Sequence, residues 1–558
     1  MPTLDWIGKK AVLNHHREVP YRLLRCESGL SAGDTDSGNL LVQGDNLLAL
    51  KALLPYYAGK VKCIYIDPPY NTGDEKWVYN DAVNSPEIRM WLGKAVGREA
   101  EDLSRHDKWL CMIYPRLSLL RQFLRSDGVI FVSIDENEVG HLRPLMDEVF
   151  GAPNALGTLV WKRRSSSAMR GTPLSVDHEY VLVYAFDAGS ASLYGLSKGI
   201  EDYPYEDKDG RYTSTDLTVG MGKDARPGQF YQITNPRTGR VYAANPERVW
   251  RFWPETMDKV IAANLIIWPD EEGGRMERPR FKTYFDPNTS KPKPISSWID
   301  TSNTNDREIA ENEAEFGSTI LTSGMTQEGG KLLQQIMGTK VFAYPKPLSL
   351  IRSIVRATTR RDDLVLDSFA GTGTTAHAVL DMNREDEGSR RFILVEMDTE
   401  ICREITAERL RRIIVGYTFK KPKGGETKVE GLGGGFRYCT LGEPLFDEAG
   451  NIRENVKFPE LAAHIFFTET GSPIPKQVSG KTPFLGEHNG KAVYLLFNGI
   501  LGDKSVKGGN VLTNEVLRHL SNHGGTKVIY GEGCRLGGAR LKREGIVFRQ
   551  IPYEIRTS

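Results

Sequence analysis

The stretch Val61-Lys-Cys-Ile-Tyr-Ile-Asp67-Pro68-Pro69-Tyr70-Asn71 decides the fold of this chain. Its first six residues are mainly β-formers and predict a buried strand. Two consecutive prolines fix φ, remove two backbone donors and hold the residues before them extended, so the strand cannot continue. We therefore expect a stiff turn at the carboxyl end of a central strand, the edge where open α/β sheets bind their ligands. A carboxylate, carbonyls without neighbouring N–H partners and an aromatic ring meet in that turn.

The composition is that of a folded protein with several domains. A chain of 558 residues with 39% hydrophobic and 26% charged residues is expected to form about three to four domain-sized units. No apolar run of membrane-spanning length and no signal-peptide pattern occurs, so we expect no membrane association and no export. The six cysteines are scattered without a CxxC pair, which predicts neither a zinc site nor a disulfide and fits a reducing cytosol. The net charge of +1 neither favours nor excludes nucleic acid.

The first half of the chain alternates between strand and helix patterns. After an N-terminal arm (1–38), residues 39–186 predict a catalytic part that contains the turn at Asp67. The predicted strands are 39–44, 61–66, 129–134, 156–161 and 179–186, and the predicted helices are 46–57, 109–125 and 138–150. The polar segment from residue 73 to about 105 is long enough to be a lid or substrate loop.

A basic, serine-rich loop joins the last two of these strands. It contains Lys162, Arg163, Arg164 and Arg170. Such a run is usually a solvated surface, but its place beside the expected catalytic edge makes contact with phosphate groups an equal alternative.

Residues 187–340 interrupt the alternation and predict an inserted domain. Short aromatic segments are interleaved there with Arg, Lys, Asn and Pro, which are the residue types that stack on bases and pair with phosphates. The alternative is that these rings form the core of a small, irregular β domain, and both interpretations can hold together. The rings concerned are Tyr203, Tyr205, Phe230, Tyr231, Trp250, Phe252, Trp253, Trp268 and Trp298.

Alternation resumes in residues 341–420, and a second set of functional residues lies there. The segment Leu366-Asp367-Ser-Phe369-Ala-Gly371-Thr-Gly373-Thr374 predicts a strand, a glycine turn and a helix, where backbone approaches a nucleotide-like ligand closely. Glu396 ends the next predicted strand and is placed to accept hydrogen bonds from a ribose. An acid beside the glycines suits a cationic or zwitterionic ligand, so S-adenosylmethionine fits better than NAD. No GxxxxGK[ST] loop for NTP phosphates occurs.

The rest of the chain is expected to be a linker (421–435) and a C-terminal domain (436–558) with strands at 492–497, 527–530 and 546–551. No convincing catalytic cluster is found in that domain. A nuclease site can be imagined from Glu460, Glu469, Glu487 and Lys491, but we do not favour it.

The two sets together predict methylation of an exocyclic amine. Hydrogen bonds from an adenine amino group to the Asp67 carboxylate and the Pro68 carbonyl would free the nitrogen lone pair, while Tyr70 stacks on the base. Transfer is then one displacement that depends on positioning and electrostatics, and it requires no metal. A paired base cannot reach such a site and has to be flipped out of the duplex.

These residues resemble the amino-methyltransferases of DNA bases, whose hallmarks are (D/N/S)PP(Y/F/W) and FxGxG. The order, with Asp67-Pro68-Pro69-Tyr70 first and Phe369-Ala-Gly371-Thr-Gly373 second, is that of the permuted "beta" group. Asp67 to Gly73 is similar to the modification subunits of type III restriction–modification systems. The resemblance covers residues 39–186 and 341–415, and Asp rather than Ser at the first catalytic position favours adenine N6 over cytosine N4.

The resemblance implies the fold class and the roles of the site residues. The expected fold is α/β, a Rossmann-like methyltransferase fold with a mixed, mostly parallel seven-stranded sheet in permuted order, an inserted target-recognition domain and a small C-terminal α/β domain. The implied catalytic residues are Asp67, Pro68, Pro69 and Tyr70. The implied cofactor-binding residues are Asp45, Lys346, Asp367, Phe369, Gly371, Gly373, Thr374 and Glu396. Contacts to nucleic acid are expected from Asn71, Lys162, Arg163, Arg164 and Arg170.

The expected cofactor is S-adenosylmethionine and the expected main partner is duplex DNA, in the cytoplasm and at the nucleoid. A second copy of the chain and a restriction or other defence-system subunit are further candidate partners. Three alternatives stay open: methylation of cytosine N4, methylation of RNA or protein, and a catalytically silent DNA-binding scaffold.

Overall fold

The computed structural model describes most of the chain. It covers residues 3–72, 101–165, 174–193, 203, 205–219, 222–271, 277–285, 294–301, 319–421, 424–475, 482–497, 509–520, 523–553 and 555. The proposed lid segment from residue 73 lies outside the described residues up to Glu101, where a helix begins.

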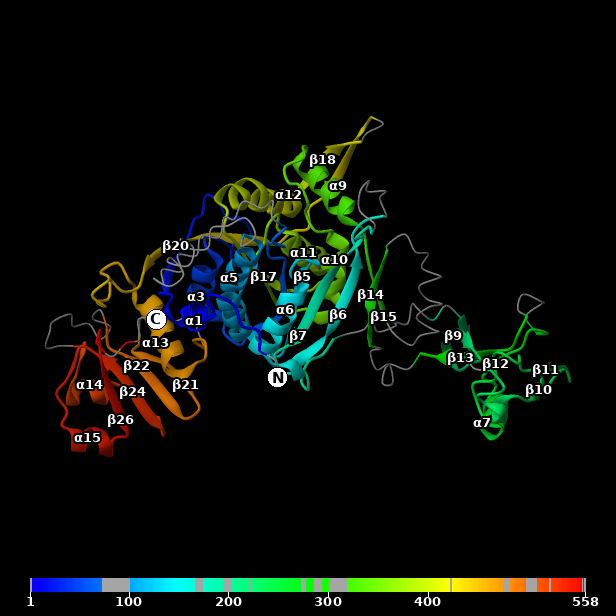
Figure 1. Cartoon of the computed structure of the whole chain (residues 1–558). Coiled ribbons are helices and arrows are strands. Elements are labelled where there is room, and N and C mark those ends of the chain that lie inside the picture. Colours follow the sequence, from blue (N-terminus) through cyan, green and yellow to red (C-terminus); the bar gives the residue numbers. More distant parts are fainter. Residues whose placement is uncertain are drawn as a thin grey trace. The chain divides into compact units, whose positions relative to one another are not determined.

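A mixed sheet forms the centre of the larger compact unit, which comprises residues 1–192, 297–301 and 322–558 (Figure 1). Its central strands run in the order β3-β17-β16-β4-β5-β7-β6, and only β7 runs antiparallel to its neighbours. The expectation of a mixed, mostly parallel sheet is therefore confirmed. The bounds of these strands are β3 (Leu40–Gln43), β17 (Arg391–Glu396), β16 (Leu364–Asp367), β4 (Val61–Ile66), β5 (Leu124–Ile134), β7 (His178–Ala185) and β6 (Ala155–Lys162).

The sheet is larger than the expected seven strands, because both edges are extended to give twelve. At one edge β20 pairs with β3, and β1 and β2 pair with β20; at the other edge β14 and β15 follow β6. The sequence did not predict β1 and β20, because neither carries the continuous apolar run of a buried strand. These strands are β1 (Arg22–Cys26), β2 (Ala32–Gly33), β20 (Gly435–Pro444), β14 (Ile295–Thr301) and β15 (Thr319–Ser323).

Two cysteines correct the expectation that the chain has no disulfide. Antiparallel pairing of β1 with β20 brings Cys26 opposite Cys439, although 413 residues separate them, and their sulfurs are bonded. The separation hid this pair from sequence reasoning, because only the strand register makes the two residues neighbours. The cysteine-based argument for a reducing compartment therefore no longer applies.

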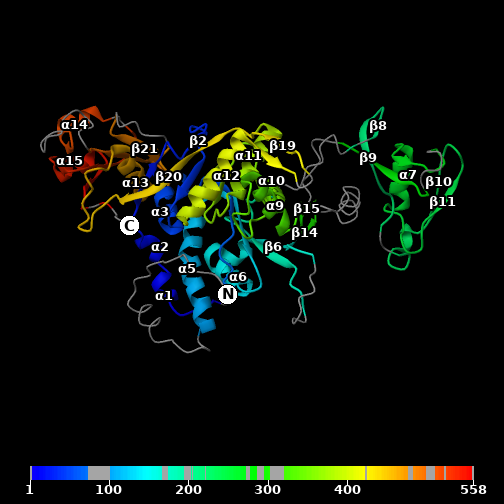
Figure 2. The ribbon, with the colours of Figure 1, turned by 90° about the horizontal axis from the view of Figure 1, so that it is seen from above.

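Helices cover both faces of the central sheet. Alternate strand residues such as Leu40, Val42, Ile64 and Ile66 join one buried cluster with α3, α5 and α13. The strand residues between them are also buried, on the face covered by α10, α11 and α12, which lie together in Figure 2. These helices are α3 (Asn46–Tyr57), α5 (Glu101–Phe123), α13 (Phe458–Thr470), α10 (Leu348–Thr358), α11 (Thr374–Asp386) and α12 (Glu408–Val415).

Two predicted helix boundaries in the first half are wrong by several residues. The helix expected at 109–125 begins at Glu101 and ends at Phe123, and the following strand already begins at Leu124. Ser126 to Gly128 lies inside that strand, where a register shift opposite β4 accommodates a sequence that looks like a turn. The helix expected at 138–150 is α6 (Val139–Met146), which continues as a π-helical turn η1 (Asp147–Gly151).

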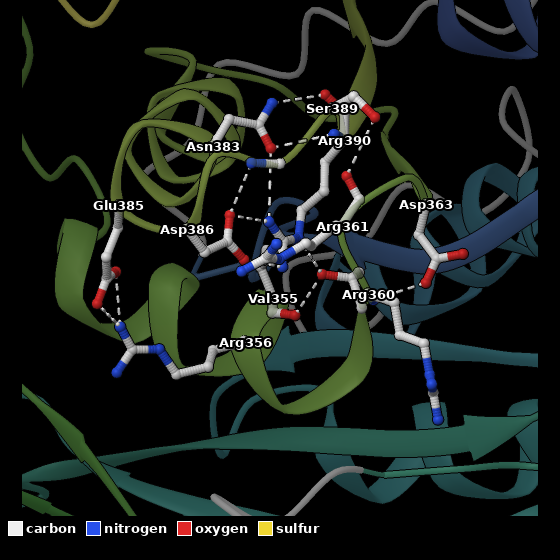
Figure 3. Close-up of polar contacts among 12 residues, drawn as sticks. Val355, Arg356, Arg360, Arg361, Asp363, Asn383, Glu385, Asp386, Ser389 and Arg390 are labelled. Carbon is white, nitrogen blue, oxygen red and sulfur yellow. Dashed lines mark hydrogen bonds and ion pairs between the residues drawn. The ribbon is translucent and has the colours of Figure 1, made fainter. Parts of the chain in front are cut away.

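Arginines tie α10 to α11 and α11 to β17 (Figure 3). Arg356 binds both oxygens of Glu385 at 2.6 and 2.7 Å. The buried Arg390 binds Asp386 through two parallel hydrogen bonds of 2.9 and 2.8 Å, and its backbone pairs with the Asn383 side chain. A two-bond guanidinium–carboxylate contact is geometrically specific. These contacts fix the position of α10, which follows Lys346, relative to α11, which follows the glycine turn.

The second compact unit comprises residues 193–296 and 302–321. It holds a four-stranded sheet in the order β12-β13-β9-β8, a β10-β11 hairpin and the helix α7. Trp250 and Trp268 lie in its core, whereas Tyr205, Phe230 and Trp253 are exposed, so some of the rings form the core and others face solvent. Its elements are β8 (Tyr205–Asp207), β9 (Gly210–Asp216), β10 (Gln232–Thr234), β11 (Val241–Ala243), α7 (Pro254–Ala262), β12 (Ile266–Ile267) and β13 (Arg280–Tyr284).

The C-terminal part contains the three strands expected there, β22 (Lys491–Leu495), β24 (Thr526–Gly531) and β26 (Ile546–Gln550), in one sheet with β21 (Phe484–His488). The expected linker 421–435 instead contains β19 (Glu426–Glu430), which forms a hairpin with β18 (Gly416–Lys420), and β20 after it belongs to the central sheet. Glu469 contacts Tyr530 and Lys491, whereas Glu460 pairs with Arg25.

The remaining described elements are short, apart from the 12-residue helix α9. They are α1 (Lys9–Val12), α2 (His15–Glu18), η2 (Ala152–Asn154), η4 (Pro227–Gln229), α9 (Thr326–Met337), η5 (Ile401–Ala407), β23 (Val511–Leu512), α14 (Asn514–His519), β25 (Gly533–Cys534) and α15 (Gly538–Arg543). Within the described part of the chain, no helix is long and apolar enough to cross a membrane.

Candidate functional site

The two motifs lie at the ends of neighbouring strands. Asp67 directly follows β4 and Asp367 ends β16, and the two strands are parallel, with Ile64 opposite Leu366. The carboxyl ends of parallel neighbours share one edge of the sheet, so the proline turn and the glycine turn open at the same edge. Both turns follow fully buried strands, which hold them in fixed positions.

Lys346 lies at the centre of the proline turn. Its ammonium is 2.9 Å from Asp67 Oδ1, 3.1 Å from Glu179 Oε2 and 2.6 Å from the Tyr70 hydroxyl oxygen. The Tyr70 hydroxyl in turn donates to Glu179 at 3.0 Å, and the ammonium lies 4.7 Å from the Tyr70 ring centroid. One cation therefore joins two carboxylates and the aromatic ring of the motif.

Burial and charge set the ionisation of this group. Burial raises the pKa of Asp67, and the ammonium of Lys346 partly opposes that rise. Burial alone would raise the pKa of Glu179, but the nearby cations Lys346 and Arg163 outweigh burial and lower that pKa. Burial would lower the pKa of Lys346, but the two carboxylates raise it. Lys346 is thus charged, and Glu179 is its ionised partner at neutral pH.

Two carboxylates, those of Asp367 and Glu396, accept hydrogen bonds from the glycine turn and the helix after it. The Asp367 oxygens accept hydrogen bonds from the Phe369 N–H at 3.0 Å and the Thr375 hydroxyl at 2.5 Å. Glu396 accepts the Gly371 N–H at 2.7 Å. Burial raises the pKa of Asp367 and that of Glu396, each to about 7, so both carboxyls titrate near neutral pH.

Gly373 needs the freedom of glycine. Its φ of 76° lies in the left-handed region, where side chains are strained. A Cβ atom there would lie 3.0 Å from the methyl carbon of Thr406. Phe369 and Thr374 are buried on either side of the glycines.

Hydrogen bonds also connect the glycine turn with Lys346 and with the start of α3. The Thr374 hydroxyl donates to the Lys346 carbonyl at 3.4 Å, and Asn46 donates to the Ser368 carbonyl at 3.2 Å. Asp45, before Asn46, caps α3 by accepting the Leu48 N–H at 3.0 Å and pairs with Arg116 at 3.1 Å. The residues expected to bind a cofactor therefore lie around one edge of the sheet. The Lys346 side chain is the exception, because it contacts Asp67.

Comparison with known proteins is consistent with this arrangement. The family model described as "DNA methylase" matches residues 61–408, more than half of the chain, and spans both motifs. The chain belongs to this DNA methylase family. In this methylase the proline turn precedes the glycine turn by about 300 residues.

Curated relatives are similar to this methylase over most of its length. The type III restriction-modification enzyme StyLTI Mod subunit of Salmonella typhimurium is 33% identical over 423 residues, which cover 73% of this chain and 60% of that one. The EcoP15I Mod subunit of Escherichia coli is 32% identical, with 71% and 64% covered. The type II methyltransferase M.KpnI of Klebsiella pneumoniae is 31% identical, with 67% and 84% covered. This chain thus spans less than two thirds of the length of the Mod subunits it matches.

Three of the five residues expected to contact nucleic acid have partners within the methylase. Asn71 is fully buried and donates to Glu138. Arg163 pairs with Glu179 at 3.1 Å, and Arg164 pairs with Asp177 at 3.4 Å. Lys162 ends β6, and Arg170 lies outside the described residues.

Three residues at the proline turn were missed by sequence reasoning. Glu179 is 112 residues beyond Asp67 and appeared only as part of a strand. Trp109 donates its ring N–H to the Pro69 carbonyl at 2.7 Å, which fixes the turn. The Pro68 carbonyl takes no part in this bond. Glu138 accepts from Asn71. No local spacing signals these contacts, although a buried glutamate near the start of a strand is a hint.

Proposed function

We propose that this methylase transfers a methyl group from S-adenosylmethionine to the N6 amino group of adenine in duplex DNA. The observation that carries the proposal is the meeting of Asp67, Tyr70 and the glycine turn at one sheet edge, with Lys346 in contact with both parts. Membership of the DNA methylase family and similarity to Mod subunits support it.

The proline turn would act on the target base. Asp67 Oδ1 and the Pro68 carbonyl accept the two amino N–H groups, and the Tyr70 ring stacks on a base that has left the duplex. The Lys346 ammonium now donates to Asp67 Oδ1, where the substrate amine would donate. We infer that Lys346 shifts towards Glu179, 3.1 Å away, when the base enters, so that neither carboxylate is left unpaired.

The glycine turn fits the cofactor. S-adenosylmethionine supplies an electrophilic methyl group on its sulfonium when bound. The Ser368 hydroxyl is buried and, among the described residues, lacks a hydrogen-bond partner, as expected beside a polar ligand. Asp367 and Glu396 would bind its cationic and ribose groups, Gly371 and Gly373 would allow close approach, and Asp45, Phe369 and Thr374 would complete the site.

The motif order supports a permuted arrangement. Residues 39–186 would carry the catalytic half, residues 341–420 the cofactor half, and the interval 187–340 the target-recognition domain. The arm 1–38 and the strand β20 extend the sheet, so the C-terminal domain would begin after Pro444. Exposed Tyr205, Phe230 and Trp253 give the recognition domain rings that can contact bases.

We propose further that the chain is the modification subunit of a restriction–modification or related defence system. The similarity to Mod subunits supports this role. Its partners would be duplex DNA, a restriction or other defence subunit, and a second copy of the chain. It would work in the cytoplasm, at the nucleoid when bound to DNA.

Single-molecule sequencing of DNA from a methylation-free host that expresses the chain tests the proposed target. We expect N6-methyladenine at one short sequence motif. N4-methylcytosine in a motif would instead favour the alternative target, and methylated rRNA or protein without modified DNA would refute DNA as the substrate.

Exchange of residues 193–294 tests the recognition domain. With the corresponding residues of a related methylase, and with β14 retained, the chain is expected to methylate the relative's sequence motif, because base readout requires the surface that is exchanged. Sequencing of modified bases measures the motif. An active chimera with its original motif contradicts the assignment.

Cofactor affinity is expected to rise with pH. Asp367 and Glu396 have pKa values of about 7, so at about pH 6 a proton must leave before a cationic group can pair with the carboxylate. Between about pH 6 and pH 8 the association constant for S-adenosylmethionine is expected to increase about tenfold, measured by calorimetry. The variant Asp367→Asn serves as the control and is expected to weaken the dependence, because only Glu396 still titrates in this range. Equal wild-type affinity at both pH values contradicts the assigned roles.

Glu179→Gln tests the positioning role of Glu179. Without this charge Lys346 pairs with Asp67 alone and competes with the substrate amine, so kcat is expected to fall by up to about 100-fold. KM for the cofactor is expected to change little. Glu136→Gln, at a nearby exposed position, is the matched control. An unchanged kcat in the Glu179 variant contradicts the proposed movement of Lys346.

A further inference from the structure

Two histidines and a glutamate lie together next to the proline turn. His106 Nδ1 on α5 is 2.6 Å from Glu138 Oε1, and His141 Nδ1 on α6 is 2.9 Å from Glu138 Oε2. One ligand atom from each residue lies within 4.8 Å of the others. The Glu138 side chain is fully buried, whereas those of His106 and His141 are 24% and 38% exposed, so the cluster is accessible to an ion from solvent.

Asn71 connects this cluster with the proline turn. It directly follows Tyr70, is fully buried and has a left-handed φ of 59°. Its side-chain nitrogen donates to Glu138 Oε1, but its Oδ1 is buried and has no hydrogen-bond partner within the described part of the chain. If this amide turns over, its oxygen faces the Glu138 carboxylate, and a cation between the two oxygens would satisfy both.

The donor set selects the class of ion. Two imidazole nitrogens and one carboxylate are ligands of Zn²⁺ and Fe²⁺ sites, whereas Mg²⁺ and Ca²⁺ favour oxygen alone. Glu138 is the N-cap residue of α6 and His141 lies in the first turn of that helix, so their side chains meet at the start of α6. His106 approaches from a separate helix, as a rigid site requires.

We propose that His106, Glu138 and His141 form a binding site for a divalent first-row transition-metal ion, with the Asn71 amide oxygen as a fourth ligand. Metal–ligand distances of about 2.0–2.2 Å require the present hydrogen-bonded contacts to open by a few tenths of an ångström, and the Asn71 amide to turn over. The ion would hold Asn71 and therefore the turn that contains Asp67 and Tyr70. This structural role goes beyond the proposed methyl transfer and departs from the expectation of a chain without metal.

Cobalt titration of the full-length chain, stripped with a chelator, tests the site. We expect one Co²⁺ per chain with visible d–d absorption, displaced by one equivalent of Zn²⁺, and a melting temperature that rises with bound metal. His106→Gln and His141→Gln are each expected to weaken binding by at least about tenfold. His519→Gln, at an exposed histidine of α14, is the matched control.

Two results would overturn the proposal. One is the absence of stoichiometric binding to the folded wild-type chain, which would make the cluster a hydrogen-bonded brace for Asn71. The other is binding that both histidine variants retain. X-ray absorption of the zinc-loaded wild-type chain decides the case if a variant does not fold, because it must report two imidazole ligands and oxygen.

Discussion

Asp67→Ala is expected to reduce methyl transfer by about 1,000-fold or more while cofactor binding remains. The carboxylate lies 2.9 Å from the Lys346 ammonium, the position where a substrate amine would donate, so its loss removes the acceptor at the reacting nitrogen. Removal of a single preorganised group at a reacting centre costs about 10²–10³ in kcat, and here it also frees Lys346. Transfer of labelled methyl groups to DNA measures the rate, and calorimetry measures cofactor affinity.

Two controls separate this role from simple misfolding. Asp127→Ala removes an aspartate from another ion pair with a lysine, Lys62, away from the proline turn, and is expected to retain methyl transfer. Asp67→Asn keeps the shape of the side chain and one acceptor oxygen, as the (D/N/S) position of the motif allows, and is expected to retain more activity than Asp67→Ala. Wild-type activity in the Asp67→Ala variant would remove that carboxylate from the mechanism.

Gly373→Val is expected to weaken S-adenosylmethionine binding by about 100-fold or more. The new Cβ would lie 3.0 Å from the Thr406 methyl carbon, at a φ of 76° that valine rarely adopts. The turn must therefore move, and with it the N–H groups and carboxylates that would hold the cofactor. Calorimetry with the purified variant measures the loss.

Gly59→Val provides a matched control for backbone strain. Gly59 also has a positive φ, 63°, but a Cβ there meets nothing within 4 Å, and it lies between α3 and β4 rather than in the glycine turn. We expect this variant to lose stability but to keep its cofactor affinity. If the Gly373 variant binds as tightly as the Gly59 variant, the glycine turn is not the cofactor site.

The nearness of the two motifs could be predicted from the sequence. Each motif follows a continuous run of buried residues that are mainly apolar, Cys63–Ile66 or Leu364–Leu366, and parallel buried strands end at a common edge. The motif residues are therefore placed by the fold itself, and reading two strand ends is enough to bring Asp67 and Asp367 together.

The contacts between the motifs could not be predicted in the same way. Lys346 was assigned to the cofactor, but its side chain turns to Asp67, Tyr70 and Glu179. Such pairing depends on which long side chain neutralises a buried carboxylate, and a lysine can reach several partners from one backbone position. Glu179 became a neighbour only through the antiparallel pairing of β7 with β5.

Strand register explains the errors about the disulfide and about the helix that was expected to end near Ser126. β1 and β20 have no continuous apolar pattern, and their pairing alone places Cys26 beside Cys439. The Ser126 to Gly128 segment looks like a helix stop but lies inside β5, because the neighbouring strand and the core determine where that strand begins. Long-range pairing overrides local turn signals at these positions.

Mass spectrometry of nucleosides tests the central claim most directly. The purified chain is incubated with duplex DNA and S-adenosylmethionine carrying a deuterated methyl group, and the DNA is digested to nucleosides. We predict deuterated N6-methyladenine with the wild-type chain and almost none with Asp67→Ala. Label found only in N4-methylcytosine, or no labelled nucleoside from a folded chain that binds the cofactor, would contradict the account.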